Sequence, residues 1–141
     1  LSNKPLPIYS KGQNSREWIY VKDHCEALYQ IYKKGKIGQS YNVGSNINLK
    51  NINVVKNILN IFKKKGFKFG KNVKIKFVKD RPGHDFRYSL DSKKIKKSIK
   101  WKSKTSLLKG LGMTVDWYLH NRKFITSISK KLYVKRLGLK I

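Results

Sequence analysis

Apolar and polar residues alternate over several short stretches of this chain and recur every three to four residues over longer ones. Alternation is typical of half-buried strands, and the longer period is typical of amphipathic helices. Strands are therefore predicted at residues 6–9, 16–21, 40–44 and 73–78. Helices are predicted at residues 23–34 and 52–65, over a short basic stretch after Asp91, and from Thr105 or Ser106 to Leu119.

The ends of these segments carry residues that begin and end regular structure. Asp23 is predicted to cap the helix that follows it, Asp91 to cap the short basic helix, and Gly35 to end the first helix. Two prolines restrict residues 6–9 to an edge strand or an extended loop. Helices and short strands alternate, which predicts an α/β fold. Four short strands are too few for a free-standing sheet, so the sheet is expected to be incomplete.

Composition fits one domain with a hydrophobic core and excludes several classes of protein. The chain has 141 residues, of which 39% are hydrophobic, enough to bury a core. A single cysteine, Cys25, excludes an internal disulfide framework, and no apolar run approaches the ~20 residues that span a bilayer. No membrane partner is therefore expected, and the predicted location is the cytoplasm. Because the first residue is Leu1 and the only methionine is Met113, we expect the tail of a longer protein.

The charge of the chain is strongly positive but is spread over its whole length. Lys and Arg together number 34 against 7 Asp and Glu, which gives a formal net charge of +27. Such a surface binds polyanions weakly and in a salt-dependent manner. Recognition of bases and phosphates favours the planar Arg fork, however, and nearly all of these cations are Lys, including most of the basic tail at residues 122–141. No specific nucleic-acid partner is therefore expected, and a basic nucleic-acid-binding module is kept as the alternative from another class.

The segment with the most candidate chemistry runs from Asp80 to Asp91 and reads D-R-P-G-H-D-F-R-Y-S-L-D. Its Pro-Gly pair forces a turn that can present Arg81 and His84 to an anion, with Asp80 or Asp85 orienting them. The alternative is an Arg–Asp pair that only braces the loop. Spacing does not decide between the two interpretations.

A second candidate pairs an aromatic residue in the first predicted strand with a cation in the next one. Tyr9 followed by Arg16 suits stacking on a base together with diphosphate binding, or else a packed Tyr and a surface ion pair. Asn51 is placed either to contact a ligand or to cap the helix that starts at residue 52.

Several motifs in the chain are shared with one group of enzymes. They are L-P-I-Y at residues 6–9, R-E-W-I-Y-V-K-D at 16–23, Y-N-V-G at 41–44, D-R-P-G-H-D-F-R-Y at 80–88 and T-V-D-W-Y at 114–118. Together they resemble the dTDP-glucose 4,6-dehydratases, which are extended short-chain dehydrogenase/reductases. The second and third motifs are widespread among nucleotide-sugar epimerases, dehydratases and decarboxylases, whereas the fourth is narrower. Ser10 and Glu17 depart from the Gly and Asp usual in the family.

The resemblance implies a two-part enzyme, in which a Rossmann domain binds NAD and a smaller C-terminal part binds the dTDP-sugar. By this analogy Pro7 and Tyr9 line the thymidine pocket. The residues that hold the ribose and diphosphate are Arg16, Asn51, Arg81 and His84. The family reaction converts dTDP-glucose to dTDP-4-keto-6-deoxyglucose: NAD⁺ takes a hydride from C4, water is lost across C5 and C6, and the hydride returns to C6.

The catalytic and NAD-binding motifs of that family do not occur here. Its Tyr-x-x-x-Lys pair, Thr-Asp-Glu set and glycine-rich loop lie upstream, and the nearest spacing match, Tyr29 and Lys33, falls on a predicted outer helix. Residues 1–141 are thus interpreted as the C-terminal substrate-binding part of an extended Rossmann-type enzyme, binding neither NAD nor metal alone. Residues 17–44 are expected to pack on the N-terminal Rossmann portion, and the complete protein to form a homodimer. The alternative is another nucleotide-sugar epimerase or decarboxylase.

Overall fold

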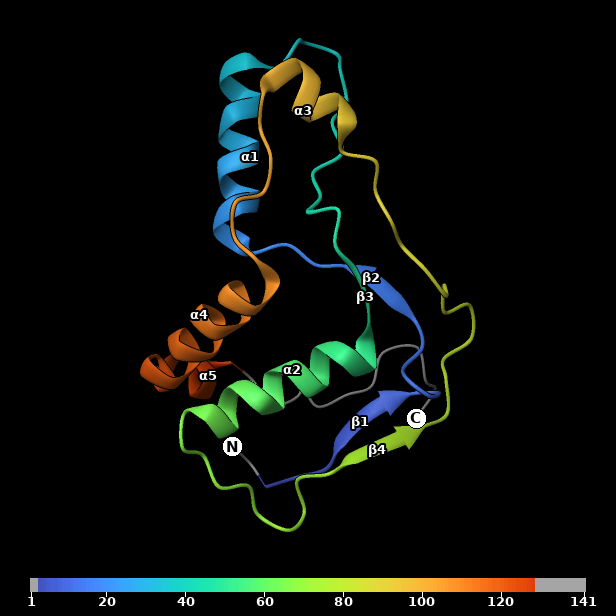
Figure 1. Ribbon diagram of the computed structural model, residues 1–141, viewed down its shortest axis with the longest axis vertical. Coiled ribbons are helices and arrows are strands. Elements are labelled where there is room, and N and C mark those ends of the chain that lie inside the picture. The colour runs from blue at the N-terminus through green and yellow to red at the C-terminus, as the bar shows by residue number, and fades with distance from the viewer. Residues whose placement is uncertain (1–2, 129–141) are drawn as a thin grey trace.

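A computed structural model describes residues 3–128 and contains short strands and longer helices (Figure 1). In chain order the elements are β1 (Leu6–Tyr9), β2 (Ser15–Glu17), α1 (Val21–Lys34), β3 (Asn48–Lys50), α2 (Asn51–Lys64), β4 (Ile75–Val78), α3 (Lys93–Ile99), α4 (Leu107–His120) and α5 (Arg122–Ser127). Figure 1 shows α1 and α3 together at one end of the molecule, and α2 with β1 and β4 at the other. The predicted mixture of helices and strands is confirmed.

The strands form two separate pairs. β1 lies parallel to β4, with Leu6 opposite Ile75 and Tyr9 opposite Val78, while β2 lies antiparallel to β3. Parallel neighbours require a long crossover connection, which here contains α1 and α2. The two-stranded pairs confirm that the sheet is small and incomplete. Residues 6–9, left open between a strand and a loop, form a strand.

Two strand predictions are wrong, and pairing explains both. The strand predicted at residues 16–21 ends at Glu17, because its partner β3 has only three residues, and Val21 already begins α1. The strand predicted at residues 40–44 is not formed, and β3 is the strand that follows α1. A strand is stabilised by hydrogen bonds to a neighbour, and among residues 3–128 no strand pairs with residues 40–44.

The helix ends predicted from the sequence are confirmed only in part. Gly35 ends α1 and donates its N–H to Ile31 O at 2.7 Å, and Ser106 caps α4 through Lys109 N–H. Asp23, however, is not the N-cap of α1, since the helix begins two residues earlier. Ser92 precedes α3, although Asp91 still accepts the Lys93 N–H at 2.8 Å.

The buried core joins α1 to α3 and the segment that follows it. Its fully or nearly fully buried members are Ala27, Ile95, Ile99 and Trp101, and partly buried apolar residues pack around them. Asp23, 6% exposed, fastens this unit to the loop before α4. Its carboxylate accepts hydrogen bonds from Ser103 Oγ at 2.7 Å, Lys104 N at 2.9 Å and Thr105 N at 2.8 Å, and Thr105 Oγ1 donates a fourth.

One side of α1 is apolar and faces outward. Val21, Leu28 and Tyr29 are more than half exposed, Tyr32 is 86% exposed, and Ile37 just beyond the helix is fully exposed. No helix among the described residues is both long and apolar enough to cross a membrane. In the predicted basic tail, residues 122–127 form α5, and residues 129–141 lie outside the described residues.

Candidate functional site

The candidate site starts where β1 and β4 end side by side. Tyr9 is the last residue of β1 and lies opposite Val78, the last residue of β4. Because the strands are parallel, both chains leave at the same edge, and Asp80 follows two residues later. Ligands of open α/β sheets bind outside this carboxyl edge of the strands.

A buried histidine connects the two strand ends. The His84 side chain is 7% exposed, and its Nδ1 lies 2.6 Å from Asp80 Oδ1. The same ring lies edge-on to Tyr9, with ring centroids 5.6 Å apart. The hydrogen bond to His84 lowers the pKa of Asp80, and the Arg81 N–H acts in the same direction. Asp80 is therefore an ionised carboxylate that fixes the orientation of the imidazole.

Arg81 stands at the start of the tight turn after β4. Its backbone N–H donates to Asp80 Oδ1 at 2.9 Å, and the turn continues through Gly83, whose φ of 64° suits glycine. Arg81 is partly buried, and its side chain forms no ion pair with Asp80 or Asp85 within residues 3–128. Its positive charge nevertheless lowers the pKa of Asp80, so the contact between Arg81 and Asp80 in the turn is through the backbone N–H and through charge.

Arg16 of β2 is fixed to the far end of the same loop. Its Nη1 donates to Ser15 O at 2.7 Å and to Phe86 O at 3.4 Å, and its Nη2 donates to Asp85 O at 2.7 Å. The guanidinium lies over the ring of Tyr88, 4.5 Å from the centroid. The backbone reinforces this junction, because Ser15 N donates to Phe86 O and Tyr88 N donates to Ser15 O.

Asn51 and Pro7 join the site from two further elements. Asn51 heads α2, and its N–H donates to Asn14 O at 2.9 Å, while the Asn14 side chain donates to Asp85 O at 3.3 Å. Lys50 precedes the helix, so the interpretation of Asn51 as the cap of α2 is wrong. Pro7 lies on the same face of β1 as Tyr9, because side chains two apart in a strand share a face.

No role was predicted for Tyr88, whose ring contacts the guanidinium of Arg16. Its hydroxyl donates to the Asp85 carboxylate, and this hydrogen bond raises the pKa of Tyr88. The positive charges of Arg16 and Arg81 act against that rise. The D-x-R-Y ending of the loop motif, in which Tyr88 stands, was the available signal.

The structure therefore brings the predicted residues together to different degrees. Tyr9 and His84 are in direct contact, and Arg81 shares Asp80 with His84. Arg16 is hydrogen-bonded to the same loop, whereas Asn51 is joined to it through Asn14. The Arg81 guanidinium and the His84 imidazole on this loop, with the Arg16 guanidinium of β2 bound to it, suit charge-assisted binding of an anion. The Tyr9 ring beside His84 suits an aromatic group.

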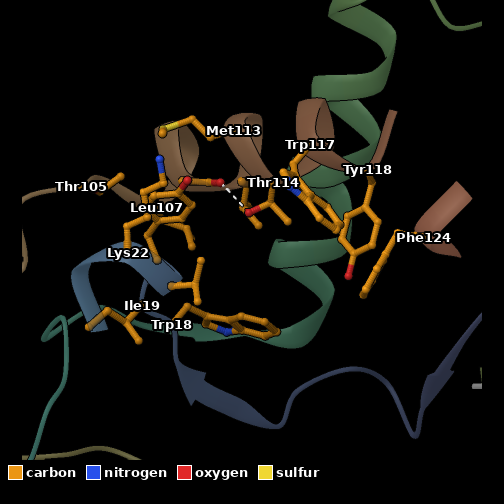
Figure 2. A pocket seen from close by; sticks show the side chains of 14 residues that line it. Trp18, Ile19, Lys22, Thr105, Leu107, Met113, Thr114, Trp117, Tyr118 and Phe124 are labelled. Carbon is orange, nitrogen blue, oxygen red and sulfur yellow. Dashed lines mark hydrogen bonds between the residues drawn. The ribbon is translucent and has the colours of Figure 1, made fainter. Parts of the chain in front are cut away.

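A separate apolar cavity of about 570 Å³ lies between α4, α5 and the segment before α1 (Figure 2). Figure 2 shows the rings of Trp18, Trp117, Tyr118 and Phe124 around it, with Lys22 as its charged residue. It contains none of the residues proposed from the sequence to bind a ligand. The residues proposed from the sequence to bind an anion therefore lie outside this apolar cavity.

The family and two curated relatives that this chain matches are nucleotide-sugar 4,6-dehydratases. Residues 1–114 match the GDP-mannose 4,6 dehydratase family. The chain is 40% identical over 138 residues to dTDP-glucose 4,6-dehydratase 1 of Escherichia coli K12, covering 94% of this chain and 37% of that protein. It is 43% identical over 123 residues to the dTDP-glucose 4,6-dehydratase of Haemophilus influenzae, covering 84% of this chain and 36% of that protein. The chain thus spans less than half the length of these relatives.

Solved structures of dTDP-glucose 4,6-dehydratases have the same fold over this region. The Bacillus anthracis enzyme in complex with NAD superposes with a TM-score of 0.75 and 36% identity, covering 86% of this chain and 36% of that one. The Streptomyces venezuelae enzyme, also with NAD bound, gives a TM-score of 0.76 and 33% identity over the same shares.

Proposed function

The chain belongs to the GDP-mannose 4,6 dehydratase family, and from this premise we propose that it is the C-terminal, nucleotide-sugar-binding portion of a dTDP-glucose 4,6-dehydratase. The proposed reaction of the complete protein converts dTDP-glucose to dTDP-4-keto-6-deoxyglucose and water. The observation that carries the proposal is the cationic loop at the carboxyl edge of β1 and β4, with Tyr9 against His84 and Arg16 bound to the loop.

Each proposed ligand contact has a physical basis. Arg81 supplies N–H donors and positive charge to a diphosphate, and charge-assisted hydrogen bonds of this kind are about twice as strong as neutral ones. His84 offers the ring nitrogen that does not contact Asp80. Arg16 adds charge from β2, and Asn51 offers an amide to the ribose. Tyr9 offers its ring to the thymine, with Pro7 beside it on the same strand face.

The described residues do not fit NAD. A dinucleotide site needs a strand, a glycine-rich turn and a helix within a parallel sheet. β1 leads instead through a turn to β2, and β4 leads to the Arg81–His84 turn. We therefore derive no redox step from this chain and assign it binding and orientation of the nucleotide sugar, with NAD held by the N-terminal Rossmann portion.

The exposed face of α1 is the proposed contact with that portion. Residues 17–44 contain the outward-facing apolar residues of α1 and the unpaired segment at 40–44, which both need a neighbour. A sheet of the N-terminal portion would cover the apolar face of α1 and pair with residues 40–44. The proposed complete protein is a homodimer, as the resemblance to the family implies, and its proposed location is the cytoplasm.

Other nucleotide sugars are the main competing ligands. The matched family is named for GDP-mannose, whereas the curated relatives are named for dTDP-glucose. The D-R-P-G-H-D-F-R-Y motif at residues 80–88 favours dTDP. A UDP-sugar epimerase or decarboxylase is the second candidate, and preference for the base separates them.

The test uses a fusion protein, in which the N-terminal portion of the Escherichia coli relative is joined ahead of residue 1 of this chain. Isothermal titration with dTDP, UDP and GDP is carried out at about 0.15 M and about 1 M salt, where the Debye lengths are about 8 Å and 3 Å. The proposal predicts tightest binding of dTDP at both salt concentrations, and turnover of dTDP-glucose. Equal affinities for dTDP, UDP and GDP, all lost at high salt, would indicate only non-specific binding by a basic chain and would overturn the proposal.

A further inference from the structure

The guanidinium of Arg16 donates hydrogen bonds to three backbone carbonyls. Both Nη1 hydrogens are directed at Ser15 O and Phe86 O, and one Nη2 hydrogen at Asp85 O. A guanidinium has five N–H donors. The Nε–H and the second Nη2–H therefore have no hydrogen-bond partner among residues 3–128, and they are the donors that a bound anion can take.

Carbonyl contacts on one edge do not by themselves fix the plane of the guanidinium. The ring of Tyr88 adds a contact to the face of the group, with its centroid 4.5 Å from Cζ. The ring is itself tethered, since its hydroxyl donates to the carboxylate of Asp85 three residues earlier. The carbonyl of Asp85 holds Nη2, so one residue fixes both the guanidinium and the ring beneath it.

We propose that Tyr88, anchored by Asp85, is a positioning residue that holds the two unpartnered donors of Arg16 toward the diphosphate of the nucleotide sugar. This inference rests on the proposed function and extends it to a residue outside the predicted site. Cation–π contact gives the ring its effect, and the hydroxyl adds only the tether. A Phe at this position should therefore retain most of the effect, and an aliphatic residue should lose it.

The alternative is that Tyr88 only stabilises the loop. A structural role would weaken binding of every ligand of the site and lower the melting temperature. A positioning role affects the diphosphate alone. Comparing dTDP with thymidine, which has the same base and sugar but no diphosphate, separates the two roles.

The experiment measures dissociation constants of dTDP and thymidine for the 141-residue chain and for the fusion protein. Tyr88→Leu, Tyr88→Phe and Asp85→Asn are compared with Phe77→Leu, a control on an exposed ring of β4 on the opposite strand face from Tyr9. A cation–π contact of ordinary strength predicts a rise of about 3- to 30-fold in the dTDP dissociation constant for Tyr88→Leu. Thymidine binding should stay unchanged, and kcat should fall less than KM rises.

The conservative variants refine the expected result. Tyr88→Phe should stay within about threefold of wild type for dTDP. Asp85→Asn should lie between wild type and Tyr88→Phe, because the ring is kept and the amide oxygen still accepts the phenol hydrogen, in a weaker hydrogen bond without charge.

Three outcomes would overturn the inference. If Tyr88→Leu leaves the dTDP dissociation constant unchanged, the ring is not part of the site. If Tyr88→Leu weakens binding of dTDP and thymidine equally and lowers the melting temperature, the role of Tyr88 is structural. If Tyr88→Phe binds dTDP as weakly as Tyr88→Leu, the aromatic ring alone does not position Arg16. Failure of the wild-type fusion protein to prefer dTDP over thymidine would instead overturn the proposed function itself.

Discussion

The imidazole of His84 lies edge-on to the phenol ring of Tyr9, with centroids 5.6 Å apart, and this contact joins residues 75 positions apart in the chain. It exists because β1 and β4 are parallel and end at the same level. Asp80 fixes the same imidazole, because its Oδ1 lies 2.6 Å from Nδ1. A ring suited to a base and a ring suited to an anion are thereby placed next to each other.

Removal of the Arg81 guanidinium should raise the KM of the fusion protein for dTDP-glucose by about 10- to 100-fold. One charge-assisted contact to the diphosphate contributes roughly 1.5–3 kcal/mol. Steady-state kinetics of Arg81→Ala measure this, and His84→Ala should act in the same direction more weakly. Lys97→Ala on α3 removes an equal charge far from the site and should leave KM unchanged. An Arg81→Ala variant with wild-type KM would take Arg81 out of the site.

Replacement of Asp23 by Asn should lower the free energy of unfolding by about 1–3 kcal/mol at neutral pH. The carboxylate holds Ser103, Lys104 and Thr105 against the first turn of α1. Asp116→Asn is the matched control, because Asp116 pairs with Lys65 at the surface, where ion pairs contribute at most about 1 kcal/mol. Urea unfolding of both variants makes the comparison, and equal losses would contradict the account.

The contribution of Asp23 should also depend on pH in a defined direction. Burial raises the pKa of this carboxyl, but the hydrogen bonds from Thr105, Ser103 and Lys104 outweigh burial and hold the pKa below its ordinary value. A pKa lower in the folded chain than in the unfolded chain stabilises the fold above the unfolded value of about 3.9. This stabilisation should disappear as pH falls through the lower, folded pKa. The difference in unfolding free energy between wild type and Asp23→Asn should therefore shrink below about pH 4, and a difference that grows there would refute the assignment.

Substitution of Gly12 by Ala should destabilise the chain more than substitution of Gly38. Both glycines have positive φ, 68° and 76°, so each alanine carries a backbone cost of about 1–2 kcal/mol. A Cβ at Gly12 would also lie 2.9 Å from side-chain atoms of Ile8 and Ile52, whereas nothing lies within 4 Å of one at Gly38. Thermal unfolding of the two variants measures the excess at Gly12. Similar melting temperatures would show that the turn between β1 and β2 is more tolerant than these contacts indicate.

The outward face of α1 should be needed for contact with the N-terminal portion and dispensable for the fold of this chain. Tyr32→Glu and Ile37→Lys place charge on the two most exposed apolar side chains. They should weaken association between the separately expressed halves by at least tenfold, measured by pull-down and titration, with little change in circular dichroism of the chain. Tyr118→Glu, on α4, serves as the comparison at a half-exposed ring elsewhere. Unchanged association in the α1 variants would exclude this face as the contact.

Much of the fold was predictable because local signals determine it. The apolar period of α2 and the glycine at the end of α1 both give the correct element. The predictions at residues 18–21 and 40–44 failed because the strand character of a segment is realised only with a partner, and β2 finds only the three residues of β3. The position of Asp23 was misjudged because α1 begins at Val21, which no capping residue marks.

The charged residues of the candidate site were predictable from the sequence, whereas the residues that hold them in place were not. The turn at residues 80–85 and the arginine of β2 carry recognisable chemistry. Tyr88 and Asn14 act through contacts with residues about 70 positions away, such as Arg16 and Asp85, and sequence spacing does not reveal such pairs.

Arg16 and Arg81 are proposed to hold one diphosphate, and separate titrations with dTDP and with thymidine give the clearest test. The fusion protein and its Arg16→Ala, Arg81→Ala and doubly substituted variants are measured with both ligands. The account predicts that each variant loses about 10- to 100-fold in affinity for dTDP while its affinity for thymidine stays the same. Equal losses for the two ligands, or no loss for dTDP in the doubly substituted protein, would contradict it.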